Sequence, residues 1–221
     1  MHSKSTRSPA PARLSREDRR LQTRTALREA ALREFALFGV SGTSAERIAE
    51  SAGYTRGAFY ANFENKQALL FELISEHITA EQASWLELAN SRLDLDTLLQ
   101  TLDQRTERFD PDGLWSLIGS ETYLYALRDP AFAVRYREFH ESIRNTFVQI
   151  IRNLMQRAGK TSPVPLEEFC DAMLTLSRSV RLPTADQPDS APLAFSRTLL
   201  MNMVRGLLAI ATTAPTAPTA P

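Results

Sequence analysis

The segment TSAERIAESAGYTRGAFYANF, residues 43–63, holds two short helical patterns on either side of Gly53. The second pattern places Phe59 and Phe63 four positions apart, on one side of a short helix. The first places apolar residues three and four positions apart, and so predicts a helix with one buried face. These residues are Ala45, Ile48, Ala49 and Ala52. Two short helices with so little chain between them predict a helix-turn-helix.

Polar residues at the start of each helix support this prediction. Thr43-Ser-Ala-Glu46 has the sequence of a capping box, in which the Thr43 hydroxyl accepts from the Glu46 N–H and the Glu46 carboxylate accepts from the Thr43 N–H. Thr55 is placed to cap the second helix. Both helices therefore have a start signal in the sequence.

The side of the second helix that faces away from the phenylalanines combines a guanidinium, hydroxyls, an amide and small residues. Its members are Thr55, Arg56, Gly57, Tyr60, Ala61 and Asn62. Such groups read base-pair edges in the major groove, and small residues allow close approach. Lys66 follows at the start of the next helix, where its ammonium and the helix N-terminus both favour a phosphate. Taken alone, the pattern also fits an exposed amphipathic surface that never touches DNA.

The rest of the chain repeats apolar residues at helical spacing and lacks alternating β-branched runs, which predicts an all-α protein. We expect further helices at 15–38 (ending at Gly39), 65–92, 94–109, 112–127, 130–158, 165–182 and 192–211. We predict four parts, which are an arm without regular structure, a helix-turn-helix domain, a ligand-binding and dimerisation domain, and a proline-rich tail. Their ranges are 1–14, 15–66, 67–211 and 212–221.

Composition argues against several function classes. One cysteine, Cys170, excludes an internal disulfide framework and a cysteine-rich zinc site. His140-Glu141 starts like a metalloprotease helix, but Arg144 stands where the second histidine belongs. There is no glycine-rich phosphate loop and no nucleophile elbow, so we expect no catalytic residues, no metal and no cofactor. No apolar stretch is long enough to span a bilayer or has the pattern of a secretory signal, and we expect a cytoplasmic protein without membrane contact.

Charge is distributed unevenly, although the net charge is zero. Residues 1–66 hold 12 Lys and Arg against 7 Asp and Glu, and the remainder is acidic by the same margin. A positive N-terminal part on an acidic body orients a protein toward phosphate. The arginines of the arm could add phosphate contacts, or they could simply be solvated.

Three stretches resemble the DNA-binding domain of the TetR family of transcriptional repressors. They are AALREFALFGV at 30–40, TSAERIAESAG at 43–53 and YTRGAFYANFENKQALL at 54–70, together about a fifth of the chain. The most specific part is the run Gly57, Phe59, Tyr60, Phe63, Lys66, Leu69 and Leu70. The resemblance implies a dimeric repressor that binds a palindromic double-stranded operator and is released by a small-molecule effector.

The resemblance also implies roles for single residues on the phosphate side of the interface. Tyr60, Lys66 and Thr55 match residues that contact phosphate in the family. Thr43 and Ser44 lie at the start of the preceding helix, near the DNA backbone.

Arg56 and Gly57 match positions that face bases, and the Arg56 guanidinium could bond guanine bidentately. The sequence departs from the family at three places. Ala61 and Asn62 stand where an aromatic residue and a histidine are usual, and Ala45 replaces a contacting hydroxyl. Asn62 can still donate to phosphate, whereas Ala61 removes a large contact.

The resemblance further implies an effector cavity among the aromatic-rich middle helices. Our candidates combine bulk with a polar tip and are Trp115, Glu121, Tyr123, Tyr136 and His140. A buried Glu121 would favour a cationic ligand. Most other aromatic residues of these helices are expected in the core.

The last predicted helix is apolar nearly all round, so it must be covered on two sides. By resemblance, the last two helices pair with their symmetry mates in a four-helix interface; alternatively both sides are buried within one chain. The candidate interface residues are Phe169, Met173, Leu176, Val180, Leu199, Met203 and Leu207.

In such a dimer, the two helix-turn-helix domains must meet successive major grooves about 34–36 Å apart. A ligand that favours another spacing between these domains lowers the affinity for DNA. The predicted helix at 65–92 connects the helix-turn-helix domain to the ligand domain, so it can transmit a movement from one to the other. The alternative function is a helical protein-interaction module that does not bind DNA.

Overall fold

The computed structural model describes residues 15–108, 110, 113–181, 193–194 and 197–213. The predicted all-α fold is confirmed, because about four fifths of the described residues lie in helices and very few lie in strands. The helices are α1 (Arg16–Gly42), α2 (Ala45–Ser51), α3 (Arg56–Tyr60), α4 (Lys66–Ala89), α5 (Leu95–Arg108), α6 (Leu114–Arg128), α7 (Pro130–Arg157), α8 (Leu166–Ser177) and α9 (Arg197–Ile210). Among the described helices, none combines the length and the hydropathy needed to cross a membrane.

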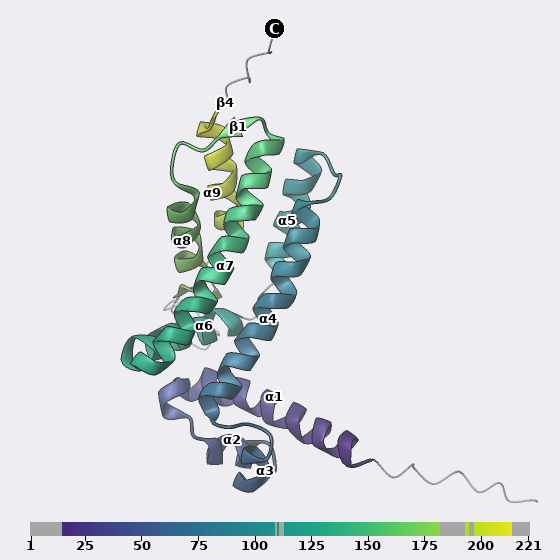
Figure 1. Ribbon diagram of the computed structural model, residues 1–221, viewed down its shortest axis with the longest axis vertical. Helices are drawn as coiled ribbons and strands as arrows, with labels where there is room; N and C mark the ends of the chain where they lie inside the picture. The colour runs from purple at the N-terminus through teal and green to yellow at the C-terminus, as the bar shows by residue number, and fades with distance from the viewer. Residues whose placement is uncertain (1–14, 109, 111–112, 182–192, 195–196, 214–221) are drawn as a thin grey trace, which may run out of the picture.

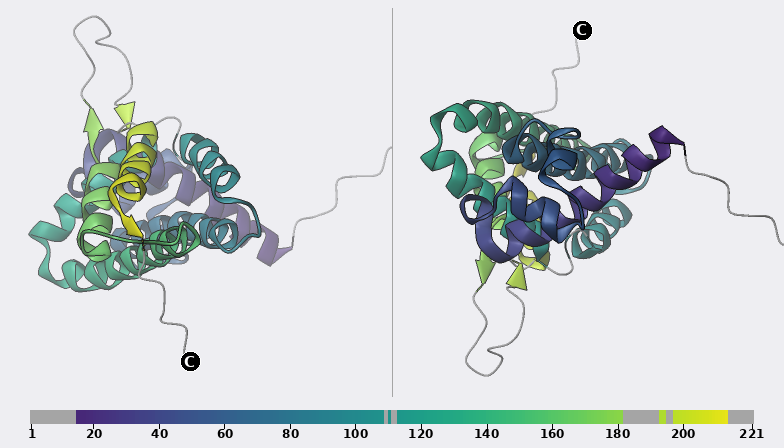
Figure 2. Two further views of the ribbon diagram at one scale, coloured as in Figure 1. Left: turned by 90° about the horizontal axis from the view of Figure 1, so that it is seen from above. Right: turned by 90° about the horizontal axis from the view of Figure 1, so that it is seen from below.

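Two pairs of very short antiparallel strands accompany the helices. β1 (Lys160–Thr161) pairs with β4 (Thr212–Thr213), and β2 (Val180–Arg181) pairs with β3 (Leu193–Ala194). The arrows of β2 and β3 lie side by side at one edge of the molecule (Figure 2). The segment 212–221, predicted to lack ordered structure, therefore begins with two residues in a strand. The predicted arm at 1–14 and the remainder of the tail lie outside the described residues.

The helices form an N-terminal head and a larger body that are joined by α4. In Figure 1, α1, α2 and α3 lie together at one end, and α4 runs from them into the body beside α5 and α7. One apolar cluster is centred on α1, α2, α3 and the start of α4, and extends to α6 and the start of α7. A second cluster joins the far end of α4 to α5, α7, α8 and α9. α4 thus contributes to both cores.

Polar caps fix where the helices of the head begin. The Ser15 hydroxyl accepts from the Asp18 N–H (3.0 Å) and the Asp18 carboxylate accepts from the Ser15 N–H (3.0 Å), which is a complete capping box for α1. Asn65 caps α4 through an Ala68 N–H donor at 2.7 Å. Gly39 interrupts α1 with φ of +69°, a conformation that L-residues rarely adopt, and confirms the predicted break there.

The predicted capping box at Thr43 is wrong by one residue. Ser44 caps α2, since its hydroxyl accepts from the Arg47 N–H at 3.1 Å. Thr43 instead points into the head with 1% of its surface exposed, and its hydroxyl donates to the main-chain carbonyls of Glu34 (3.0 Å) and Gly39 (2.8 Å). Thr43 is used to hold the end of α1 rather than to start α2.

The C-terminal helices are shorter than predicted. α8 ends at Ser177 and is followed by β2, so Val180 lies in a strand and not in a helix. α9 begins at Arg197, and the residues just before it include β3. Residues 180–181 and 193–194, which were predicted at the ends of these two helices, pair with each other as antiparallel strands instead.

Candidate nucleic-acid interface and effector cavity

The outer face of α3, which we define as Thr55, Arg56, Gly57, Tyr60 and Ala61, is exposed. Behind it, Phe59 is fully buried and Phe63 is 5% exposed, with their ring centroids 5.7 Å apart. The Thr55 hydroxyl caps the helix by accepting from the Ala58 N–H at 3.2 Å. The two phenylalanines anchor this five-residue helix from the inside and the Thr55 cap fixes its start, so that its outer face is exposed to solvent. The sequence predicted this orientation from the spacing of Phe59 and Phe63.

Arg56 is the most exposed charged group of this face, with 67% of its side chain accessible. Its Nε lies 2.9 Å from a carboxylate oxygen of Glu46 in α2, and its guanidinium carbon is 5.5 Å from the centroid of the Tyr60 ring. The main-chain N–H of Glu46 and the Ser44 hydroxyl, and then the Arg56 charge, lower the pKa of the Glu46 carboxyl. The Arg56 side chain is thus held loosely across the turn in an exposed ion pair.

Asn62 does not share the outer face with the other candidates. It is half-buried, and its side-chain amide donates to the Ala58 carbonyl at 2.9 Å. Together with the buried Thr43, it is a predicted DNA contact whose polar atoms are turned toward the protein. Ser44 is exposed at the start of α2, but its hydroxyl is engaged in the cap.

Lys66 also differs from the prediction. Its Nζ donates to the main-chain carbonyls of Val40 (2.7 Å) and Thr43 (2.5 Å). Burial lowers the pKa of Lys66 from its usual range. The ammonium therefore satisfies carbonyls between the end of α1 and the start of α2, and it stabilises the corner of the head instead of pointing freely outward.

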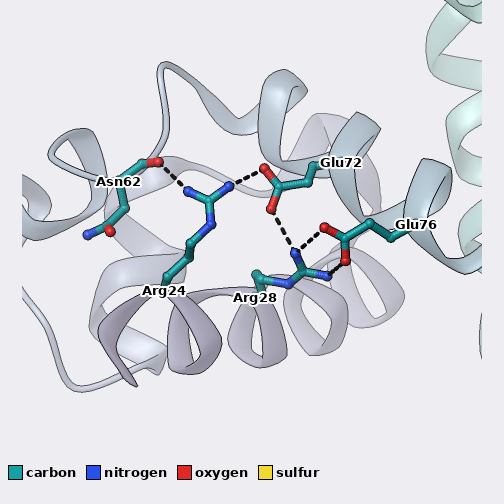
Figure 3. Close-up of polar contacts among 5 residues, drawn as sticks. All are labelled: Arg24, Arg28, Asn62, Glu72 and Glu76. Atoms are coloured by element: carbon teal, nitrogen blue, oxygen red, sulfur yellow. Dashed lines mark hydrogen bonds and ion pairs between the residues drawn. The ribbon is translucent and has the colours of Figure 1, made fainter. Parts of the chain in front are cut away.

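A charged network, which was not predicted from the sequence, ties α1 to α4 and to the residues just after α3 (Figure 3). Arg24 of α1 donates to the Asn62 carbonyl just beyond α3 (2.7 Å) and pairs with Glu72 of α4. Arg28 pairs with Glu72 (2.7 Å) and with Glu76 of α4, and the Glu76 bond lowers the pKa of that carboxyl. The only signal in the sequence is a pair of arginines four apart on one helix and a pair of glutamates four apart on another.

The body contains a largely apolar cavity of about 160 Å³ between α4, α6, α7, α8 and α9. Trp115, Tyr136 and His140, all predicted ligand residues, lie in its wall. The structure does not bring the other two candidates there. The Glu121 carboxylate accepts from the Val40 N–H (3.3 Å) at the break in α1, and Tyr123 is 41% exposed beneath the Arg178 guanidinium.

The predicted interface residues separate into three groups. Leu207 is 4% exposed in the second core cluster and Met173 lines the cavity, so both are used inside the chain. Phe169, Leu176 and Met203 are half-buried, and Leu199 is 46% exposed. Val180 lies in β2. Most apolar side chains of α9 are thus buried against other helices of the same chain.

The helix-turn-helix segment matches a known family. Residues 27–73 match the model described as bacterial regulatory proteins, tetR family. A protein of Escherichia coli K12 named "Probable acrEF/envCD operon repressor" is 47% identical over 70 residues, which is 27% of this chain and 32% of that protein. The match thus spans about a third of the length of that relative. The transcriptional repressor AcnR of Corynebacterium efficiens is 27% identical over 153 residues, 68% of this chain and 75% of that protein.

Solved structures share most of the fold. A bacterial regulatory protein of the tetR family from Rhodococcus RHA1 has a TM-score of 0.63 at 21% identity, covering 87% of this chain and 98% of that one. Salmonella enterica GusR has a TM-score of 0.58 at 22% identity, covering 86% and 96%. A structure described as a SmeT–triclosan complex has a TM-score of 0.52 at 18% identity, covering 70% and 76%. Residues 27–73 thus carry the helix-turn-helix of the tetR family of bacterial regulatory proteins, and the helical body behind it has the fold of solved regulators of that family.

Proposed function

We propose that the protein is a transcriptional repressor that binds a palindromic operator as a dimer and is released by a small molecule. The observation that carries this proposal is the outer face of α3. Arg56 and Tyr60 are 67% and 47% exposed, while Phe59 behind them is fully buried. A short helix that is anchored from one side and carries a guanidinium, a phenol and Gly57 on the other suits the major groove.

Within this proposal, Arg56 reads bases and the other exposed groups of the head hold phosphates. Tyr60 and Thr55 can donate from their hydroxyls at the two ends of α3, and Ser44 lies at the start of α2. Gly57 and Ala61 leave room for close approach. Lys66, Thr43 and Asn62 support this surface from behind through their internal hydrogen bonds.

The dimer would use the exposed side of α8 and α9. Leu199 and Ile210 of α9 are 46% and 66% exposed, and Phe169 and Leu176 of α8, a helix that contacts α9, are half-buried. Large apolar side chains that are left exposed on one helix and half-buried on its neighbour fit a protein–protein interface. Sedimentation equilibrium at micromolar concentration tests this, and a monomer there would contradict the dimer.

Release by a ligand would act through α4. Ile74, His77 and Ile78 of this helix line the cavity, and Glu72 and Glu76 of the same helix hold α1. A ligand that fits one position of α4 better than another shifts the population of head positions. The spacing of the two heads then no longer matches successive major grooves.

A gel shift with DNA from upstream of the protein's own gene tests the proposal. Binding by a phosphate-contacting head must weaken steeply as salt rises, and Arg56→Ala must weaken it for the specific fragment. The rival function is a helical protein-interaction module. It predicts no salt-dependent shift with any fragment and no effect of Arg56→Ala on DNA binding.

A further inference from the structure

The size of the cavity limits what can occupy it. Its volume is about 160 Å³. Engineered apolar cavities of roughly 150 Å³ take up benzene. A molecule built on about one aromatic ring therefore fits without rearrangement of the helices.

The walls favour a flat ring. The His77 imidazole stacks on the Trp115 indole, with ring centroids 3.8 Å apart and planes within 4°. Trp85 meets Phe147 edge to face at 5.1 Å. All four rings line the cavity. Aromatic faces and edges arranged in this way attract a further ring by offset stacking or edge contact.

Two residues that line the cavity each carry a buried polar atom for which the described residues offer no hydrogen-bond partner. Gln82 Nε2 on α4 and His140 Nε2 on α7 are buried and have no hydrogen-bond partner among the residues that the structure describes. Nearly all buried polar groups in proteins are hydrogen-bonded. A ligand that brings one hydrogen-bonding group into the cavity would provide the missing partner.

The charges of the lining argue against an ion. Among the described lining residues, one carries a carboxylate, Glu81, and one carries a guanidinium, Arg178, so their formal charges sum to zero. Arg178 already donates to the Tyr136 hydroxyl (3.2 Å). Burial, and then the Arg178 charge, lower the pKa of His140, which leaves this imidazole neutral at neutral pH. An ion entering the apolar space would lose its hydration without an excess of opposite charge.

We propose that the effector is a compact, uncharged aromatic molecule with a single hydrogen-bonding group that meets Gln82 and His140. This inference rests on the proposed function, because it names the ligand class of the effector site. It departs from the cationic ligand that a buried Glu121 would have favoured, since Glu121 is turned to α1 and lies outside the cavity wall.

The first test uses the full chain and three probes of nearly equal shape, which are benzamide, benzoate and benzamidinium. The chain has 2 tryptophans, Trp85 and Trp115, and both line the cavity, so their fluorescence reports on its occupation. We expect benzamide to quench this fluorescence at concentrations at least tenfold lower than either ion at pH 7.5. Equal or tighter binding of benzoate or benzamidinium overturns the proposal.

The second test compares benzamide with toluene in Gln82→Leu and His140→Phe. Each substitution should remove most of the preference for benzamide while toluene binds within threefold of its original affinity, which also shows that the cavity is intact. Gln100→Leu, at an exposed glutamine of α5, is the matched control and should keep the preference. A preference for benzamide that survives in both cavity variants overturns the assignment of the polar group, and the wild-type probe series stands by itself if a variant does not fold.

Binding of operator DNA by the same samples separates this inference from the proposed function. A shift of operator DNA together with no quenching by any probe would overturn the ligand class alone. Benzamide-selective binding without a DNA shift would support the ligand class and refute the repressor.

Discussion

Replacing Lys66 by methionine distinguishes a structural lysine from one that binds phosphate. Lys66 Nζ donates to two main-chain carbonyls, those of Val40 at 2.7 Å and Thr43 at 2.5 Å. A hydrogen bond to a charged group is worth about 1.5–3 kcal/mol. Because Lys66 is only half-buried, water can partly replace the ammonium, and we expect a loss of roughly 1–3 kcal/mol in the free energy of unfolding. Methionine keeps most of the length and packing of the side chain, so the loss reports on the ammonium.

The assay is urea denaturation of Lys66→Met beside Arg137→Met, an exposed position on α7 that should change stability by less than about 0.5 kcal/mol. A loss of about 2 kcal/mol lowers the melting temperature of a chain of this size by about 4–8 °C. The same variant is titrated with DNA at several salt concentrations. A lysine that neutralises one phosphate changes the slope of log K against log salt by about 0.9. Unchanged stability together with that change in slope would refute the structural role.

Three other predictions follow from the head and the cavity. Arg56→Ala should weaken binding of the specific fragment by about 1–3 kcal/mol and leave binding of non-specific DNA much less affected, because a bidentate contact to a base is lost. A gel shift in which the specific and the non-specific fragment lose equal affinity would contradict base reading. Arg24→Ala should lower the free energy of unfolding by about 1–3 kcal/mol, since its hydrogen bond to the Asn62 carbonyl and its ion pair with Glu72 are both part-buried. Arg20→Ala, at an exposed site on the same helix, is the control in urea denaturation, and equally small losses in both variants would count against the network. The lowered pKa of His140 means that the unfolded chain takes up a proton at a higher pH than the folded chain, so the free energy of unfolding should fall as pH decreases below about 6.5. His140→Phe should reduce the loss of unfolding free energy between pH 7.5 and pH 5.5, and an unchanged loss would show that other groups cause it.

The helix-turn-helix could be predicted because its signals are local. The spacing of Phe59 and Phe63 decides which side of α3 is buried, and no distant residue is needed to see it. The turn at Gly53 has φ of +75°, which glycine adopts without strain. Helix starts were less certain, because Thr43 and Ser44 are adjacent candidates for the same cap and only packing against α1 selects between them.

Partners far apart in the sequence could not be predicted. Lys66 binds a carbonyl 26 residues away, and Arg24 pairs with a carboxylate 48 residues away. Both depend on the angle at which α1 crosses α4, which no residue spacing reveals. Glu121 illustrates the same difficulty, since it lies two turns from Trp115 on α6 yet faces α1 instead of the cavity.

The position of α4 explains how occupation of the body could reach the head. Glu76 and His77 are neighbours on this helix, and one holds Arg28 while the other lines the cavity on Trp115. A ligand that shifts the main chain of α4 at His77 would move the Glu76 main chain with it, because the two residues belong to the same helical turn. The paired arginines of α1 must then follow or break, and Arg24 passes the displacement to the Asn62 carbonyl at the end of α3. Because these ion pairs are only part-buried, they can rearrange at low energetic cost. The coupling should therefore depend more on the hydrogen bond from Arg24 than on the number of charges in the network.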